Sequence, residues 1–145
     1  MTLFNSPLQI ANLTLPNRLV MPPMATAKSG DDGKVTRELC EYYEEKSHGG
    51  HIGLIITEHS FVSPEGKAGS GQLSIADDSD IPGLRELVSV IHRNGTKVMA
   101  QINHAGGAAK REIPGREAIS AGAVLMPRTA AGSPLPREMT AADIR

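Results

Sequence analysis

Three short apolar runs constrain the fold of this chain more than any other feature of its sequence. They cover residues 18–21, 52–57 and 96–102. Each run is too short for a helix, and continuous apolar runs of this length are typical of strands that a parallel sheet buries on both faces. The sequence therefore predicts three buried strands.

A helix is predicted between the first two of these strands. Thr36 is suited to its N-cap position, because a threonine hydroxyl can accept a hydrogen bond from a free amide of the first turn. The helix is expected to run to about His48, with Leu39 and Tyr43 on its inner face. The glycine pair at residues 49–50 is expected to end it.

A second helix is predicted between the second and third strands. Asp80 is expected to cap it, Pro82 lies in its first turn, and the Asn-Gly pair at residues 94–95 ends it. The apolar residues that follow the helical spacing are Leu84, Leu87, Val88 and Ile91.

The alternation of strands and helices indicates an α/β fold with parallel strands and with the helices on one side of the sheet. Before it, residues 8–15 alternate like a short antiparallel hairpin. After it, residues 103–136 have no long periodicity, and residues 138–145 look like the first turn of a helix capped by Thr140. We therefore expect the N-terminal part of a longer protein. The pattern alone fits either a doubly wound sheet or a β/α barrel.

The composition argues against several classes of protein. There are 15 Lys and Arg against 16 Asp and Glu without a basic cluster, which does not fit a nucleic-acid-binding surface. No apolar stretch approaches the roughly 20 residues of a membrane-spanning helix, and the N-terminus lacks a secretory signal. The single cysteine, Cys40, cannot form an internal disulfide. We therefore expect a cytoplasmic protein that binds neither nucleic acid nor membrane.

Three clusters of residues follow the predicted strands, at 22–26, 57–60 and 101–104. In parallel α/β folds, ligands bind at the carboxyl ends of the strands, so these clusters are candidate binding residues. Each cluster taken alone is also typical of residues that anchor a turn. No phosphate-binding loop motif occurs. The histidines His48, His51, His59 and His104 are not spaced as the ligands of a metal-dependent hydrolase, so no metal site is predicted.

Four motifs occur along the chain in order. They are Asn-Arg-Leu-Val-Met-Pro-Pro-Met at 17–24, Gly-Leu-Ile-Ile-Thr-Glu at 53–58, Ser-Pro-Glu-Gly at 63–66 and Gln-Ile-Asn-His-Ala-Gly at 101–106. In this order and spacing, the chain resembles the old yellow enzyme family of FMN-dependent ene-reductases, which includes NADH:flavin oxidoreductases similar to 2,4-dienoyl-CoA reductase. The resemblance implies a (β/α)8 TIM barrel closed at the bottom by the hairpin. Residues 1–145 would then be the N-terminal part of one FMN-binding domain.

The resemblance also implies which residues bind the flavin. Pro23, Met24 and Ala25 match the segment whose backbone lies along the isoalloxazine ring. His59 matches a position after the second strand that approaches the flavin through its main chain, and Gln101 matches a glutamine that hydrogen-bonds the flavin pyrimidine. In this family the substrate-binding pair, the catalytic acid and the phosphate-binding loops come from later strands. No catalytic residue is therefore expected within this chain.

Two residues depart from the family pattern. Ala25 stands where family members often carry Cys, Thr or His, and a methyl group cannot donate a hydrogen bond to the flavin. A lower flavin reduction potential is therefore expected than in relatives with a thiol or a hydroxyl at this position. Gly107 stands where family members frequently carry Arg, which is expected to alter the loop over the substrate.

The resemblance implies an enzyme that moves a hydride from NADH or NADPH through FMN to an activated alkene, such as an enone or an enoyl thioester. An iron–sulfur cluster is expected only if a further domain follows. A complete barrel takes roughly 250 residues, so we do not expect the 145-residue chain to bind FMN tightly by itself. The alternative function is a non-catalytic barrel fragment that associates with a second chain, including a homo-oligomer that covers its open sheet edges.

Overall fold

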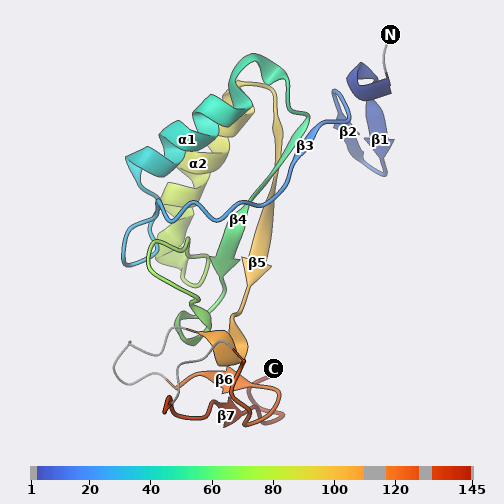
Figure 1. The fold of residues 1–145 in the computed structure, drawn as a ribbon. Helices are drawn as coiled ribbons and strands as arrows, with labels where there is room; N and C mark the ends of the chain where they lie inside the picture. The colour runs from blue at the N-terminus through green and yellow to red at the C-terminus, as the bar shows by residue number, and fades with distance from the viewer. Residues whose placement is uncertain (1–2, 110–116, 128–131, 145) are drawn as a thin grey trace.

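The computed structural model describes residues 3–109, 117–127 and 132–144. An N-terminal hairpin leads into a parallel sheet with two helices, and a C-terminal segment lies beyond the carboxyl ends of the longest strands (Figure 1). The helices and strands are β1 (Leu8–Ile10), β2 (Leu13–Leu15), β3 (Val20–Met21), α1 (Arg37–Ser47), β4 (Leu54–Phe61), α2 (Ile81–Arg93), β5 (Lys97–Asn103), β6 (Ile119–Ser120) and β7 (Arg137–Glu138).

The predicted hairpin is confirmed. β1 and β2 pair antiparallel, and Gln9 lies opposite Thr14. Ala11 has a φ of 46°, which lets the chain reverse within two residues. The hairpin lies at the end of the sheet opposite to the C-terminal segment (Figure 1).

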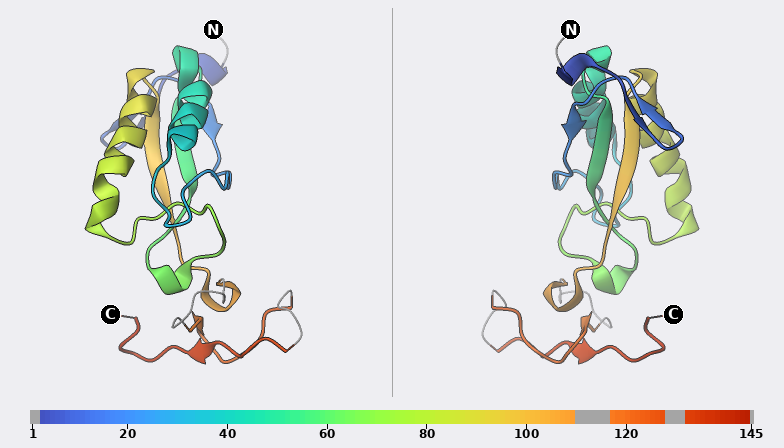
Figure 2. Two further views of the ribbon diagram at one scale, coloured as in Figure 1. Left: turned by 90° about the vertical axis from the view of Figure 1, so that its left-hand side faces the viewer. Right: turned by 90° about the vertical axis from the view of Figure 1, so that its right-hand side faces the viewer.

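The central sheet has the strand order β3-β4-β5, and both pairs of strands are parallel. Both helices lie on the same face of it, as two turned views show (Figure 2). This arrangement confirms the predicted α/β layout. β3 begins two residues later than the predicted strand, because the Arg18 amide donates to the Phe4 carbonyl oxygen and the Leu19 amide donates to Asn17 Oδ1.

A β-bulge interrupts the pairing of β4 with β5. Leu54, Ile55 and Ile56 pair with consecutive residues of β5 starting at Lys97, but the ladder resumes at His59 opposite Gln101. Two residues of β4 therefore stand where β5 has one. β4 also continues to Phe61. Residues 58–60 therefore lie inside the strand, whereas the sequence predicted that they follow it. The bulge allows this longer strand because it realigns the ladder.

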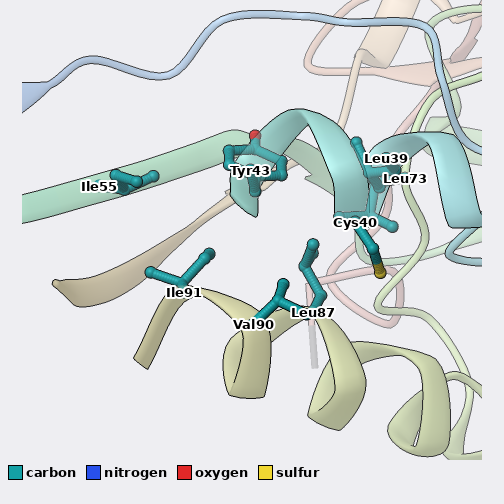
Figure 3. Packing of buried hydrophobic residues seen from close by; sticks show 8 residues of the cluster. All are labelled: Leu39, Cys40, Tyr43, Ile55, Leu73, Leu87, Val90 and Ile91. Atoms are coloured by element: carbon teal, nitrogen blue, oxygen red, sulfur yellow. The ribbon is translucent and has the colours of Figure 1, made fainter. Parts of the chain in front are cut away.

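The core lies between the two helices and β4. Ile55 of β4 faces Tyr43 of α1 and Ile91 of α2, as the close view shows (Figure 3). The fully packed cluster comprises Leu39, Cys40, Tyr43, Ile55, Leu73, Leu87, Val90 and Ile91. Burying one such aliphatic side chain stabilises a fold by about 1.5–3 kcal/mol, so this cluster is the main support of the sheet–helix layer.

The helix ends agree only in part with the sequence. The Thr36 hydroxyl accepts a hydrogen bond from the amide of Leu39 at 3.1 Å, as predicted. Asp80 stands at the N-cap of α2 but makes no side-chain hydrogen bond to that helix, because its carboxylate binds the preceding turn instead. In α2, Val90 joins the buried cluster, whereas the predicted core residue Val88 is only half-buried.

Two further predictions are wrong. β5 was expected to be buried on both faces, but Met99 is 51% exposed and Ile102 is 67% exposed. These two residues lie on opposite faces of the strand, so neither face of β5 is fully covered by the described residues. Residues 138–145 were expected to begin a helix, but 141–144 form a turn in which Asp143 accepts a hydrogen bond from the Thr140 amide at 2.7 Å. Arg137 holds the same carboxylate at 2.8 Å, which fixes that turn.

Candidate functional site

The candidate residues from the three sequence clusters meet at the carboxyl end of the sheet. His59 and Gln101 are direct neighbours across β4 and β5, because the bulge sets them opposite each other. Ala25 follows β3 and lines the same cavity as His59. The prediction that these clusters converge is thus consistent with the fold, although His59 belongs to the strand itself.

The segment Pro23–Ala25 lies open at this edge of the sheet. Met24 is 53% exposed, and among the described residues the backbone groups of Met24 and Ala25 make no hydrogen bond to the rest of the chain. The chain is fixed directly afterwards, where the Thr26 amide donates to the Glu58 carboxylate at 2.8 Å. The segment therefore presents free backbone donors and acceptors from an anchored position.

Glu58 provides this anchor from within the protein. It is 1% exposed, and its own amide donates to the Tyr43 hydroxyl at 2.7 Å. Burial raises the pKa of Tyr43 well above its ordinary value, which keeps that hydroxyl neutral. Helix α1 thus reaches through Tyr43 and Glu58 to the loop that carries Ala25. The sequence places Glu58 in the candidate cluster 57–60, but no local pattern could reveal this contact.

A cavity of about 170 Å³ lies at the carboxyl end of the sheet. It is lined by residues 25–27, which follow β3, by Glu58 and His59 of β4, and by residues 68–72. Gln72 is 5% exposed, and its carbonyl oxygen accepts a hydrogen bond from the Ala68 amide at 2.6 Å. Its amide nitrogen donates to Asn103 Oδ1 at 3.2 Å, so Gln72 joins the loop to β5. Sequence analysis did not identify Gln72 as a site residue.

Gln101 has the free groups that a flavin edge requires. Its side chain is exposed on β5 and makes no hydrogen bond among the described residues. A primary amide offers both a donor and an acceptor, which matches the alternating groups of a pyrimidine ring. Together with the free backbone of the Met24–Ala25 segment, this donor set fits the polar edge of FMN.

His104, the other histidine among the candidate clusters, has a structural contact. His104 accepts a hydrogen bond from the Gly106 amide at 3.0 Å and packs against Gly66, so it supports the loop after β5. Within residues 3–109, 117–127 and 132–144, no group of three or more His, Cys, Asp or Glu side chains is arranged to hold a metal ion. Over the same part of the chain, no helix has the length and apolar character needed to cross a membrane.

Comparison with known proteins gives a match over nearly the whole chain. Residues 2–145 match the model of the NADH:flavin oxidoreductase / NADH oxidase family. The chain is 42% identical over 135 residues to the NADH:acrylate oxidoreductase of Vibrio harveyi, which covers 92% of this chain and 13% of that protein. It is 37% identical over 143 residues to the NADPH dehydrogenase of Geobacillus thermodenitrificans, covering 99% of this chain and 40% of that protein.

The fold is also similar to that of solved structures of old yellow enzymes. The structure of the old yellow enzyme homologue from Zymomonas mobilis superposes with a TM-score of 0.85 at 24% identity, over 97% of this chain and 41% of that one. The open sheet with its two helices is therefore the N-terminal portion of a TIM barrel, as the resemblance implied. The chain spans 40% or less of the two curated relatives described above.

Proposed function

Because the chain belongs to the NADH:flavin oxidoreductase / NADH oxidase family, which includes the old yellow enzymes, we propose that its carboxyl-edge residues form one side of an FMN site. The family is enzymatic, with FMN as cofactor and NADH or NADPH as reductant. In this proposal Pro23, Met24, Ala25, His59 and Gln101 contact the flavin ring.

The side chain of Gln101 and the backbone of residues 23–25 have different parts in binding. The Gln101 amide donates to and accepts from the pyrimidine edge, and the open Pro23–Ala25 backbone lies along the ring. Glu58 holds the Thr26 amide at 2.8 Å, so the end of that segment keeps a fixed position. Fixed donors at the polar edge of a flavin stabilise the negative charge that develops there on reduction.

The proposed reaction of the whole enzyme is the reduction of an activated alkene, such as an enone or an enoyl thioester. FMN held by these residues would supply hydride transfer from NADH or NADPH to one carbon of the alkene, and the other carbon would take a proton. The name of the Vibrio harveyi relative supports this class, because acrylate is an alkene activated by a carboxylate. A cytoplasmic location belongs to the same proposal, since the reductant is a nicotinamide cofactor of that compartment.

The observation that carries the proposal is the placement of His59 opposite Gln101, beside the cavity that Ala25 lines. Three segments far apart in sequence thereby present unpaired polar groups at one edge. We expect Gln101→Leu to weaken FMN binding by the full-length protein at least tenfold. The matched control is Gln9→Leu in the exposed hairpin, which should leave the dissociation constant unchanged. Equal FMN binding by both variants would contradict the proposed site.

A second candidate is association with another chain. β5 is paired only with β4 among the described residues, and its exposed Met99 and Ile102 add apolar surface to that edge. Titration of the 145-residue chain with FMN, followed by flavin fluorescence and by sedimentation, separates the two candidates. We expect no tight binding by the isolated chain. Saturable binding by a defined homo-oligomer would favour association instead.

A further inference from the structure

The flavin-lining segment lacks a side-chain donor at Ala25, and the structure places an imidazole on the same cavity. Ala25 and His59 both line the space of about 170 Å³ between residues 25–27 and 68–72. His59 is half-buried in β4 and follows the anchoring residue Glu58. A side chain from the second strand can therefore supply the group that the first segment does not have.

The hydrogen-bond pattern of Gln72 defines which nitrogen of His59 carries the proton. The Gln72 carbonyl oxygen is identified by the Ala68 amide, which donates to it at 2.6 Å. The other end of the Gln72 side chain must then be the amino group, which can only donate. This amino group lies 3.3 Å from His59 Nδ1.

A proton on His59 Nδ1 would point at the hydrogens of that amino group. The neutral ring therefore carries its hydrogen on Nε2, with Nδ1 as the acceptor. The same amino group also lies 3.3 Å from the His59 carbonyl oxygen and 3.2 Å from Asn103 Oδ1. Its two hydrogens serve these three acceptors, so one of them is shared between Nδ1 and the carbonyl oxygen of His59. The tautomer of His59 thus follows from the hydrogen bonds of the buried Gln72 side chain.

The Nε2 hydrogen is available for a ligand. Among the described residues no group accepts a hydrogen bond from His59 Nε2, and this atom is not one of the occluded polar atoms without a partner. Glu58 Oε1 and His104 Nε2, by contrast, are buried out of reach. Among the described residues at this edge, His59 thus combines a fixed orientation with an accessible donor.

We propose that the His59 side chain donates a hydrogen bond to FMN and replaces the donor that Ala25 lacks, with Gln72 as its positioning residue. The inference rests on the proposed function, since it requires that FMN bind at this edge. The acceptor of this hydrogen bond would be an electron-rich oxygen or nitrogen of the flavin, which gains negative charge on reduction. A donor to such an atom favours the reduced form and raises the reduction potential.

The test is a double-mutant cycle on the full-length protein, read as the FMN midpoint potential. His59→Phe should lower the equilibrium constant for reduction about tenfold, which is ~30 mV for a two-electron couple. Adding Ala25→Thr to His59→Phe should restore most of that loss, because the hydroxyl returns a donor to the same cavity. The control His92→Phe, at an exposed position of α2, should leave the potential unchanged.

The outcomes separate this inference from the proposed function. If the protein takes up FMN and His59→Phe leaves its potential unchanged, the role of His59 is refuted while the flavin site stands. If the wild-type protein takes up no FMN, the proposed function itself fails. A structural role of His59 alone would lower stability without a selective change of potential, and Ala25→Thr would not reverse it.

The tautomer is open to a direct measurement that needs no flavin. In the wild-type protein, 15N shifts of His59 should show Nε2 protonated and Nδ1 as the acceptor. Gln72→Glu keeps an acceptor for the Ala68 amide but replaces the amino group with an oxygen, which should move the proton to Nδ1. A wild-type ring that is already protonated on Nδ1 would overturn the assignment.

Discussion

Replacing Asp80 by asparagine tests how the walls of the site are held together. Asp80 is 5% exposed, and its Oδ2 accepts from Ser74 Oγ at 2.6 Å, from the Ala76 amide at 3.1 Å and from the Asp77 amide at 3.2 Å. Its Oδ1 pairs with Lys34 Nζ at 2.5 Å. One carboxylate thus joins the loop after β3, the loop after β4 and the start of α2.

The expected loss of stability follows from these contacts. In Asp80→Asn the carbonyl oxygen can keep the three donors at the Oδ2 position, but its amino group then faces the Lys34 ammonium. Hydrogen bonds to a charged group contribute about 1.5–3 kcal/mol, and part of this remains with the neutral oxygen. The Lys34 side chain is 39% exposed, so solvent limits its ion pair to about 1 kcal/mol or less. We expect a total loss of about 2 kcal/mol.

The effect should depend on pH in a defined direction. Burial alone would raise the pKa of Asp80, but hydrogen bonds from Lys34, Ser74 and Asp77 outweigh it and lower the pKa below its ordinary value. A lowered pKa in the folded state means that the carboxylate stabilises the fold above the unfolded pKa of about 3.9. This contribution is lost as the pH falls through the lower folded pKa.

The assay is urea unfolding of the full-length protein at pH 7 and at pH 3. The difference between the wild-type protein and Asp80→Asn should be about 2 kcal/mol at pH 7 and should shrink at pH 3. Asp78→Asn is the matched control, because Asp78 lies exposed in the same turn. If Asp80→Asn unfolds like that control at pH 7, the carboxylate does not hold the loops together.

Four further changes test separate parts of the structure. Thr36→Ala removes the cap of α1 and should lower the free energy of unfolding by about 1 kcal/mol in urea unfolding. Gly71→Ala should weaken FMN binding several-fold by titration, because its Cβ would lie 2.5 Å from the Ala27 carbonyl oxygen at a φ of +67°. Gly95→Ala, with a φ of +79° but no atom within 4 Å, should cost only about 1 kcal/mol of stability and leave FMN binding intact. Ala25→Thr should raise the FMN midpoint potential of the full-length protein, by less than it does in the His59→Phe background because His59 already supplies a donor, and an unchanged or lowered potential would contradict the role assigned to this position.

The helices and their contacts with the core could be predicted because their signals are local. Thr36 lies one residue before α1, and Leu39 and Tyr43 are one helical turn apart, so capping and periodicity identify them without tertiary information. The predicted cap at Asp80 failed because its contacts are not local. Asp80 looks like a cap in sequence, but its carboxylate binds Ser74 and Lys34, which are brought to it by the fold.

The candidate site could be predicted only as a set of strand ends. Pro23, Met24, Ala25, His59 and Gln101 follow from the parallel topology and from the family resemblance; their contacts with a flavin remain a proposal. Gln72 was missed because it lies in a loop without periodicity, and its hydrogen bonds reach residues far along the chain. No pattern of neighbouring residues encodes such a contact.

The amino-acid sequence by itself determined the hairpin, the three central strands and the two helices, their order and much of the core, because these depend on spacing over a few residues. The tertiary structure decided which side chain stands beside Gln101. Leu54 pairs with Lys97, and an uninterrupted ladder would continue to place Glu58 opposite Gln101. The bulge shifts β4 by one residue, and since side chains alternate between the faces of a strand, His59 takes that place. Glu58 instead accepts a hydrogen bond from the Thr26 amide. The one-residue shift thus places His59, and not Glu58, beside Gln101 at the carboxyl end of the sheet, where the flavin is proposed to bind.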